Sequence, residues 1–210
     1  MFEISELSGD DRYKSAAERN IRWTLSGAKA NGWIENMAFM KEETPLTHTI
    51  AYTIRGLIES SRYQSGPDRH RTMEVVLMAA ENLMKRFELR KPTPYSMPDY
   101  LPARLNDKWK PGAEYSCLTG NCQIAIIWLK LFELTEDARF LNAALKIIDH
   151  VKATQSLDSS NPGIRGGIAG SFPIQGGYSP YSYPNWPPKF FADALILQEK
   201  MMEKLEAASV

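Results

Sequence analysis

Three helical segments of this chain begin in the same way, and this repetition constrains the fold more than any other feature. They start at Asp10, Pro67 and Glu136, and the first turn of each carries acidic residues, which complement the positive end of the helix dipole. Small and apolar residues then recur every three or four positions, which is the spacing of an amphipathic helix. We interpret these segments as outer helices. In each segment the acidic start is followed by an arginine and then by a residue with a ring side chain. These pairs are Arg12-Tyr13, Arg69-His70 and Arg139-Phe140.

A second, more apolar helix follows each outer helix. These helices read PLTHTIAYTIRGLIES at 45–60, CLTGNCQIAIIWLKLFELT at 117–135 and YPNWPPKFFADALILQEKM at 183–201. They begin with Thr, Asn or Pro, which are signals of a helix N-terminus. Helices that are apolar on most faces are buried, so we interpret these as inner helices. Because strand signals are scarce, the sequence predicts an all-α fold built from helical hairpins.

The connections between these helices alternate between long and short. The long loops lead from an outer to an inner helix and span Gly32–Pro45, Arg90–Leu118 and Gln155–Pro187. This alternation brings all three long loops to one end of the fold, where the inner helices begin and their first N–H groups are free. Long structured loops are uncommon and usually functional. We therefore expect a single domain over 1–210, with hairpins at about 10–60, 67–134 and 136–206 and any site at this end.

The composition excludes several classes of protein. Hydrophobic residues make up 43% of the 210 residues, so the chain can bury a sizeable core. Lys and Arg together number 25, as do Asp and Glu, and this balance argues against binding nucleic acid or an anionic membrane. The sequence contains no apolar run of about 18 residues, so it predicts no membrane-spanning helix. The first residues, MFEISELSGDDRYK, lack a signal peptide's apolar region, and two cysteines make no disulfide scaffold, so we expect a cytoplasmic protein.

The repeated hairpins resemble the α/α toroid proteins, and most closely the six-hairpin glycosidase-like group. The resemblance covers most of the chain and contains no catalytic signature of the group. It implies a barrel whose inner-helix face binds carbohydrate chains, often with two carboxylates as general acid and base. The stretches that carry it are NGWIENMAF with PLTHTIAYTIRGLIES, then CLTGNCQIAIIWLKLFEL, and GIRGGIAGSFPIQGGYSPYSYPNWPPKFFADAL.

The chain departs from this family in the number of its hairpins. A closed toroid of the group has six, whereas this sequence shows three. It is therefore a half-barrel that dimerises, part of a larger toroid, or an open arc. Terminal helices of a half-toroid would expose apolar sides. For this reason we expect a homo-oligomer or a larger toroid of which this chain is one part.

His48 is the first candidate catalytic residue. It lies in the predicted first turn of its inner helix, between Thr47 and Thr49, at the end where the long loops gather. Histidine titrates near neutral pH, so His48 is a candidate acid, base or hydrogen-bonding group. The alternative is a residue near the helix cap whose partners are backbone groups or the loop.

Carboxylates are the second class of catalytic candidate, because glycoside hydrolysis normally needs two. Asp193 lies inside an apolar helix, so we expect it to be buried and paired, with Arg55 or Lys130 as the partner. A loop carboxylate is more often solvated or a helix cap. The candidates near the loop-rich end are Glu35, Asp107, Glu114 and Asp158.

Aromatic residues on or beside the long loops give the clearest indication of a ligand. Aromatic faces stack on sugar rings and line other clefts, although they also hold loops in place. Trp109, Tyr181 and Trp186 are the stronger candidates among them. The full set of expected ligand-binding residues is Trp33, Thr47, Tyr52, Trp109, Tyr115, Asn121, Gln123, Arg165, Tyr178, Tyr181, Asn185, Trp186 and Lys189.

Two cofactor hypotheses receive less support. Lanthionine-cyclase-like toroids, which are more distant relatives, bind zinc through cysteines and a histidine, and this suggests a zinc site at His48, Cys117 and Cys122. The spacing matches no standard zinc pattern, and free cysteines are usually small buried hydrophobic residues. The glycine-rich GIRGGIAGSFPIQGG lacks the Lys-Ser/Thr ending of a nucleotide-binding loop. We therefore expect no metal and no other cofactor.

The leading hypothesis is a carbohydrate-active protein, similar to a glycoside hydrolase or a sugar epimerase. It would bind a saccharide or another small polar ligand at the N-terminal ends of the inner helices. The alternatives are a non-catalytic toroid that binds a saccharide or a protein, and a zinc-dependent toroid enzyme. Two carboxylates that face each other across the cleft would favour hydrolysis. An aromatic-lined cleft without such a pair would favour binding.

Overall fold

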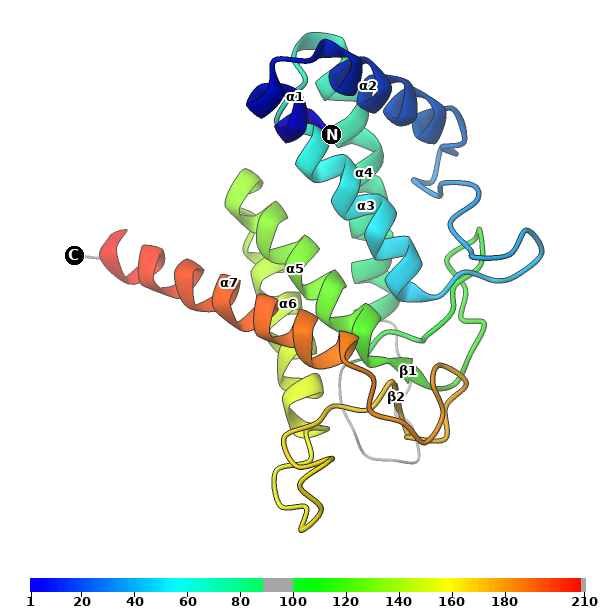
Figure 1. Cartoon of the computed structure of the whole chain (residues 1–210), viewed down its shortest axis with the longest axis vertical. Helices are drawn as coiled ribbons and strands as arrows, with labels where there is room; N and C mark the ends of the chain where they lie inside the picture. Colours follow the sequence, from blue (N-terminus) through cyan, green and yellow to red (C-terminus); the bar gives the residue numbers. More distant parts are fainter. Residues whose placement is uncertain (89–99, 209–210) are drawn as a thin grey trace.

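The chain is all-α, as the sequence predicts. The computed structural model describes residues 1–88 and 100–208, and these residues contain seven helices and one two-stranded antiparallel sheet (Figure 1). None of the described helices is long and apolar enough to cross a membrane. In chain order the elements are α1 (Phe2–Ser8), α2 (Asp11–Ser26), α3 (Thr47–Ser61), α4 (Gly66–Glu88), β1 (Ser116–Cys117), α5 (Leu118–Thr135), α6 (Ala138–Ala153), β2 (Ser171–Phe172) and α7 (Trp186–Ala208).

The longer helices form two layers. α3, α5 and α7 lie side by side in a front layer with α5 in the middle, and α4 and α6 form a back layer behind α3 and α5 (Figure 1). α5 contacts every one of these helices, and from Leu118 to Leu131 only Lys130 is not fully buried. Burial on all sides explains why the sequence of α5 is apolar all round rather than along one stripe.

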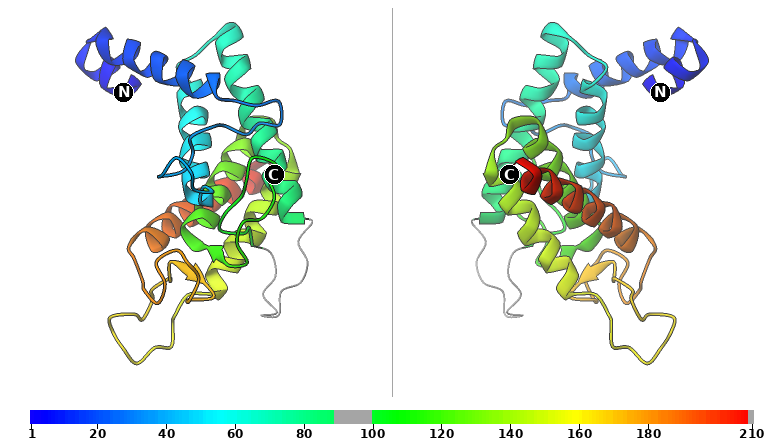
Figure 2. Two further views of the ribbon diagram at one scale, coloured as in Figure 1. Left: turned by 90° about the vertical axis from the view of Figure 1, so that its right-hand side faces the viewer. Right: turned by 90° about the vertical axis from the view of Figure 1, so that its left-hand side faces the viewer.

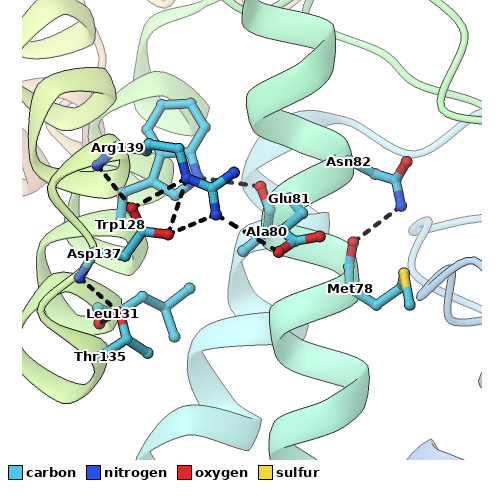
Figure 3. A network of polar contacts seen from close by, with 9 residues as sticks. All are labelled: Met78, Ala80, Glu81, Asn82, Trp128, Leu131, Thr135, Asp137 and Arg139. Atoms are coloured by element: carbon cyan, nitrogen blue, oxygen red, sulfur yellow. Dashed lines mark hydrogen bonds and ion pairs between the residues drawn. The ribbon is translucent and has the colours of Figure 1, made fainter.

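One indole and one guanidinium fix the junction between the two layers (Figure 3). Trp128 of α5 is fully buried, and its Nε1–H donates to the backbone carbonyl of Ala80 in α4 at 3.4 Å. Arg139 at the start of α6 lies 4.0 Å from Glu81 of α4 and 2.6 Å from Asp137. Loss of a buried aromatic side chain such as Trp128 typically costs about 3–5 kcal/mol, so this indole holds α5 against α4.

The repeated helix starts are helix caps. Asp10 precedes α2 and Asp137 precedes α6, and each carboxylate accepts a hydrogen bond at 3.0 Å from the backbone N–H of an arginine two residues later. The guanidinium of the same arginine, Arg12 or Arg139, also binds the carboxylate. Caps of this kind stabilise a helix by about 1 kcal/mol. The acid-x-arginine pattern therefore determines where these two helices begin.

The helices pack in different pairs from the predicted hairpins. α4 packs on α3 and α6 packs on α5, so each inner helix pairs with the outer helix that follows it through the short connectors 62–65 and 136–137. α2 does not lie along α3, as a hairpin over 10–60 would require. It lies beside the α3–α4 connector across a groove of about 260 Å³, and Figure 2 shows α1 and α2 projecting to one side. Of the residues of α2, only Ala17 and Ile21 are buried.

The long loops meet at the N-terminal ends of α3, α5 and α7, as predicted. The backbone N–H of Thr47 donates to Ala103 at 2.8 Å, and that of Leu118 donates to Gly170 at 3.0 Å. β1 and β2 add a further link, because they pair a strand before α5 with a strand from the loop before α7. Residues 90–99 of the predicted second loop lie outside the described residues. The loop contacts join the three helix starts into one end of the molecule.

Gly120 allows α3 and α5 to approach closely at this end. A Cβ at Gly120 would overlap the Oγ1 of Thr47 and lie 2.8 Å from the backbone nitrogen of His48. Any side chain at this position would therefore push the two helix starts apart. The glycine of the sequence TGNCQ thus places His48 directly beside the start of α5.

Candidate functional site

His48 lies in the first turn of α3 and is almost completely buried, with 4% of its surface exposed. Its Nδ1 is 3.5 Å from the Sγ of Cys117, the residue that caps α5. The rings of Phe39, Tyr52 and Tyr178 surround the imidazole at centroid distances of 5.6, 6.0 and 4.8 Å. The histidine is therefore enclosed by three aromatic rings and a thiol at the loop-rich end of the fold.

Burial keeps the imidazole of His48 neutral. Burial, and to a smaller extent the positive charge of Arg104, lower the pKa of His48 from 6.5 to about 4. Arg104 belongs to the loop before α5, and its guanidinium donates to the carbonyl of Thr44. At pH 7 the uncharged imidazole can donate one hydrogen bond and accept another. It has no additional proton to give as a general acid.

The two cysteines are buried thiols. Burial raises the pKa of Cys117 to about 12, and burial also raises the pKa of Cys122. The Sγ of Cys122 lies 4.0 Å from the carbonyl oxygen of Pro187, so this thiol faces the start of α7. Within residues 1–88 and 100–208, no three His, Cys, Asp or Glu side chains are grouped to hold a metal. The geometry therefore gives no support to a zinc site at His48, Cys117 and Cys122.

An aromatic cluster spans the front layer beside this histidine. It consists of Phe39, His48, Tyr52, Tyr178 and Phe190. Tyr52 of α3 and Phe190 of α7 meet edge to face with their centroids 6.0 Å apart, so together they bridge the two helices that flank α5. Phe39 is 70% exposed and Tyr52 is 48% exposed, whereas Phe190 is buried. The cluster therefore presents aromatic surface to solvent above a buried imidazole.

A groove of about 270 Å³ adjoins the aromatic cluster. Arg55 follows Tyr52 by three residues and Asp193 follows Phe190 by three residues, so the groove begins one helical turn beyond the rings. We call it the cationic groove, and we call the side of the front layer that carries it and the cluster, opposite α4 and α6, the open face. All three front helices line the cationic groove, through Arg55, Ile126, Lys130, Asp193, Ile196, Leu197 and Lys200.

Asp193 is partly buried and paired, but the prediction of its partner was wrong. Lys189, one turn earlier in α7, binds it at 2.5 Å, whereas Lys130 pairs with Glu59 of α3 at 2.6 Å. Burial opposes the ionisation of Glu59, but the hydrogen bond and the charge of Lys130 outweigh it and lower the pKa of Glu59. Each carboxylate at the groove is therefore neutralised by a lysine. The lining residues include no second carboxylate to oppose Asp193.

Gln123 is a fully buried polar residue of α5. Neither its amide oxygen nor its amide nitrogen has a hydrogen-bond partner among the described residues. Residues three, four and seven apart share one face of a helix, so Gln123 lies on the same face as Ile126 and Lys130, which line the cationic groove. A buried amide without partners costs about 1–3 kcal/mol. A polar ligand group that reached Gln123 from the groove would remove this cost.

Four predicted site residues form a separate cluster against α4. Trp33 and Trp109 are buried and meet edge to face at 5.2 Å, and Lys29 lies 3.7 Å from Glu35 and 3.1 Å from Asp107. The Nε–H of Arg86 in α4 donates to the carbonyl of Trp109 at 2.8 Å. We call this group the loop clamp, because it joins the loop before α3 to the loop before α5. These contacts give the two tryptophans a structural role.

The other predicted site residues are distributed around the loop-rich end. Thr47 is buried against Gly120, and the Oδ1 of Asn121 accepts from the backbone N–H of Leu101 at 3.4 Å. Tyr115 packs beneath the backbone of Gly176. Glu114, Arg165 and Asn185 are exposed, as are Tyr181 (75%) and Trp186 (52%). From the predicted set, the open face and its cluster bring together His48, Tyr52, Tyr178, Lys189 and Asp193, while Gln123 lies buried in α5.

The structure places further residues at the site that were not among the catalytic and ligand-binding candidates predicted from the sequence. Phe39 completes the aromatic cluster, and Arg55, Lys130 and Lys200 supply the positive charge of the groove. The sequence contained one indication of the charged groove residues, because Asp193 and Lys200 are seven residues apart and therefore lie on one face of α7. Phe39 had no comparable signal, because it belongs to an irregular loop.

Comparison with known proteins adds no assignment to this geometry. No protein-family model matches the chain, and no curated protein has a significantly similar sequence.

Proposed function

We propose that α3, α5 and α7 are consecutive inner helices of an α/α toroid arc whose open face binds a saccharide. The order of packing supports the arc. Each inner helix lies beside the next inner helix along the chain, α4 and α6 lie behind the inner helix that precedes each of them, and the long loops gather at the inner-helix N-termini. This arrangement is what three successive inner helices of a toroid would adopt.

The exposed aromatic cluster beside a polar groove carries the proposal of saccharide binding. Rings such as Phe39 and Tyr52 can stack on the apolar faces of a sugar, while groove side chains bond its hydroxyl groups. Binding is favoured over hydrolysis, because Asp193 and Glu59 are each held by a lysine. The two carboxylates of the loop clamp, Glu35 and Asp107, are both paired with Lys29.

Replacing Tyr52 by alanine tests this function. We expect the variant to bind its preferred glycan about fivefold more weakly, because an aromatic contact of this kind contributes on the order of 1 kcal/mol. Tyr13→Ala is the matched control, since Tyr13 is an exposed tyrosine on α2, away from the open face. A glycan array, followed by calorimetric titration of the strongest glycan, measures the difference. A native protein that binds no glycan would contradict the proposal, as would equal losses in the two variants.

A proton-transfer reaction of the epimerase type is the second candidate, and the contact between His48 and Tyr178 favours it. The two rings lie 4.8 Å apart, and burial raises the pKa of Tyr178, so both groups are neutral at pH 7. In such a pair the neutral imidazole of His48 can accept a proton from a sugar carbon, and the neutral phenol of Tyr178 can donate a proton back to that carbon. Incubating the protein with its glycan in deuterated water separates the two functions. If the native protein incorporates deuterium at a sugar carbon and Tyr178→Phe does not, the protein catalyses proton transfer. If the glycan is unchanged by the native protein, the protein only binds it.

A further inference from the structure

The cationic groove has an excess of positive charge in a chain whose formal net charge is zero. Its lining includes three cations, Arg55, Lys130 and Lys200, and one carboxylate, Asp193. Asp193 is already held by a lysine of its own helix. Among the described residues, neither Arg55 nor Lys200 makes an ion pair within 4.0 Å, and Arg55 acts on Glu59 only through its charge, after Lys130 has bound that carboxylate. Two cations without a direct ion pair therefore line the same groove from α3 and α7, on either side of α5.

The surroundings strengthen an electrostatic contact at this place. Arg55 is partly buried and Lys200 is exposed, while the side chain of Lys130 is only 20% exposed and is held by Glu59. Charges that are partly withdrawn from water interact more strongly with an ion than fully solvated charges do. A guanidinium also matches the planar fork of a carboxylate or the oxygens of a phosphate. The groove is therefore suited to a small anionic group.

Gln123 provides a second and independent indication of a ligand. It is fully buried, it shares a face of α5 with the groove residues Ile126 and Lys130, and both of its amide atoms are without partners in the described part of the chain. An amide can donate to one oxygen and accept from a hydroxyl group. A sugar carries both kinds of group, whereas a simple inorganic anion offers oxygens alone.

We propose that the cationic groove selects an acidic saccharide, in which a sugar unit carries a carboxylate, sulfate or phosphate group. Arg55 and Lys200 bind the anionic group from opposite sides of the groove. Gln123 bonds a hydroxyl group or ring oxygen of the same sugar, and Tyr52 stacks on a neighbouring ring. This inference rests on the proposed saccharide binding and adds the charge class of the ligand.

A glycan array that contains neutral, uronate-bearing, sulfated and phosphorylated glycans tests the inference. The test variant is Arg55→Gln with Lys200→Gln, and the matched control is Lys85→Gln with Lys146→Gln, which removes the same charge from exposed positions of α4 and α6. We expect the native protein and the control to prefer one acidic class. The test variant should bind that class about a hundredfold more weakly, because each bond to a charged group typically contributes more than a factor of ten. Thermal melting of all three proteins shows whether each is folded.

The outcomes separate the two proposals. Acidic glycans bound by the native protein and lost only in the test variant support both, and the preferred class identifies the anionic group. Neutral glycans bound equally by all three proteins overturn the acidic ligand and leave saccharide binding in place. Equal loss in the test variant and the control shows nonspecific charge attraction and also overturns the groove as the site. Binding to no glycan overturns both proposals.

Discussion

The buried imidazole of His48 links the stability of the fold to pH. Its pKa is about 4 in the folded chain, against an ordinary value of 6.5, so between these values the unfolded chain binds a proton that the folded chain does not. The stabilising effect is therefore complete above about pH 6.5 and is lost as the pH falls towards 4. From these two pKa values we expect a loss of about 2 kcal/mol between pH 7 and pH 5.

Urea denaturation of the native protein and of His48→Asn at both pH values measures this effect. The variant should lose about 2 kcal/mol less than the native protein over this interval, because asparagine does not titrate. His70→Asn, which removes an exposed imidazole from α4, is the control and should behave as the native protein does. Equal pH dependence in His48→Asn and the native protein would show that His48 is already protonated in the folded chain near pH 6.

At the scale of residues, the sequence predicts position better than role. Trp33 and Trp109 lie on the long loops, Tyr52 lies in the second turn of α3, and all three were predicted to contact a ligand. The two tryptophans turn towards each other and are buried in the loop clamp, while Tyr52 remains 48% exposed on the open face. An aromatic side chain on a loop becomes buried where another loop supplies a ring for it to pack against. That partner comes from a segment more than 70 residues away, which local sequence does not identify.

The close approach of α3 and α5 at Gly120 leads to a prediction about these two helices. Gly120→Ala places a methyl group against the side chain of Thr47 and the backbone of His48. We expect a loss of about 3 kcal/mol in the free energy of unfolding, because the atoms in the way belong partly to a helix backbone and cannot rotate aside. Chemical denaturation at pH 7 measures the change.

Gly56→Ala is the matched control for this substitution. Gly56 lies within α3, it is exposed, and nothing lies within 4 Å of a Cβ at this position. Alanine at a helical glycine that is free of contacts should stabilise the fold by about 0.5–1 kcal/mol. The two substitutions should therefore have opposite signs. A Gly120→Ala variant as stable as the native protein would mean that α3 and α5 are farther apart at this end.

At the scale of elements, periodicity predicts a helix well and its neighbours less well. The apolar sequence of α5 correctly indicates a helix that is buried on nearly all sides. α2 repeats the pattern of α4 and α6 yet buries only Ala17 and Ile21. The connectors account for this difference. Residues 62–65 and 136–137 are short and hold α4 and α6 against the helices before them, whereas the loop 27–46 lets α2 lie at the far end of α3.

At the scale of the molecule, the sequence indicates the end of the fold that carries a site but not the groove itself. The unequal loops correctly place the N-termini of α3, α5 and α7 together. The groove combines Arg55, Lys130 and Lys200, which are charged positions on three otherwise apolar helices. In the sequence, each of these Arg and Lys residues is also what a solvent-exposed helix face would carry, so none of them by itself indicates a groove. Their convergence follows from the packing order of the helices, which periodicity alone does not determine.

The exposed apolar residues of α1 and α2 lead to a prediction of self-association. Among the described helices, Leu7 and Trp23 are the most exposed large apolar side chains, at 89% and 62%. The rest of the fold covers α1 mainly through Phe2, whose ring stacks on Tyr63 at 4.8 Å. A contiguous exposed apolar patch is typical of a protein interface, and we predict that these two helices supply one. A chain with zero formal net charge has no long-range repulsion between copies, so we propose a second copy as the partner.

Light scattering on the purified protein tests this association. The native chain has a mass of 23.8 kDa, and we expect a particle of two chains that becomes a single chain in Leu7→Glu with Trp23→Arg. Burying those charges at an apolar contact costs several kcal/mol, which is enough to separate the copies at micromolar concentration. Met40→Gln is the control, because Met40 is 64% exposed in the loop before α3, and this variant should remain paired. A native protein that is monomeric at all concentrations would contradict self-association through α1 and α2.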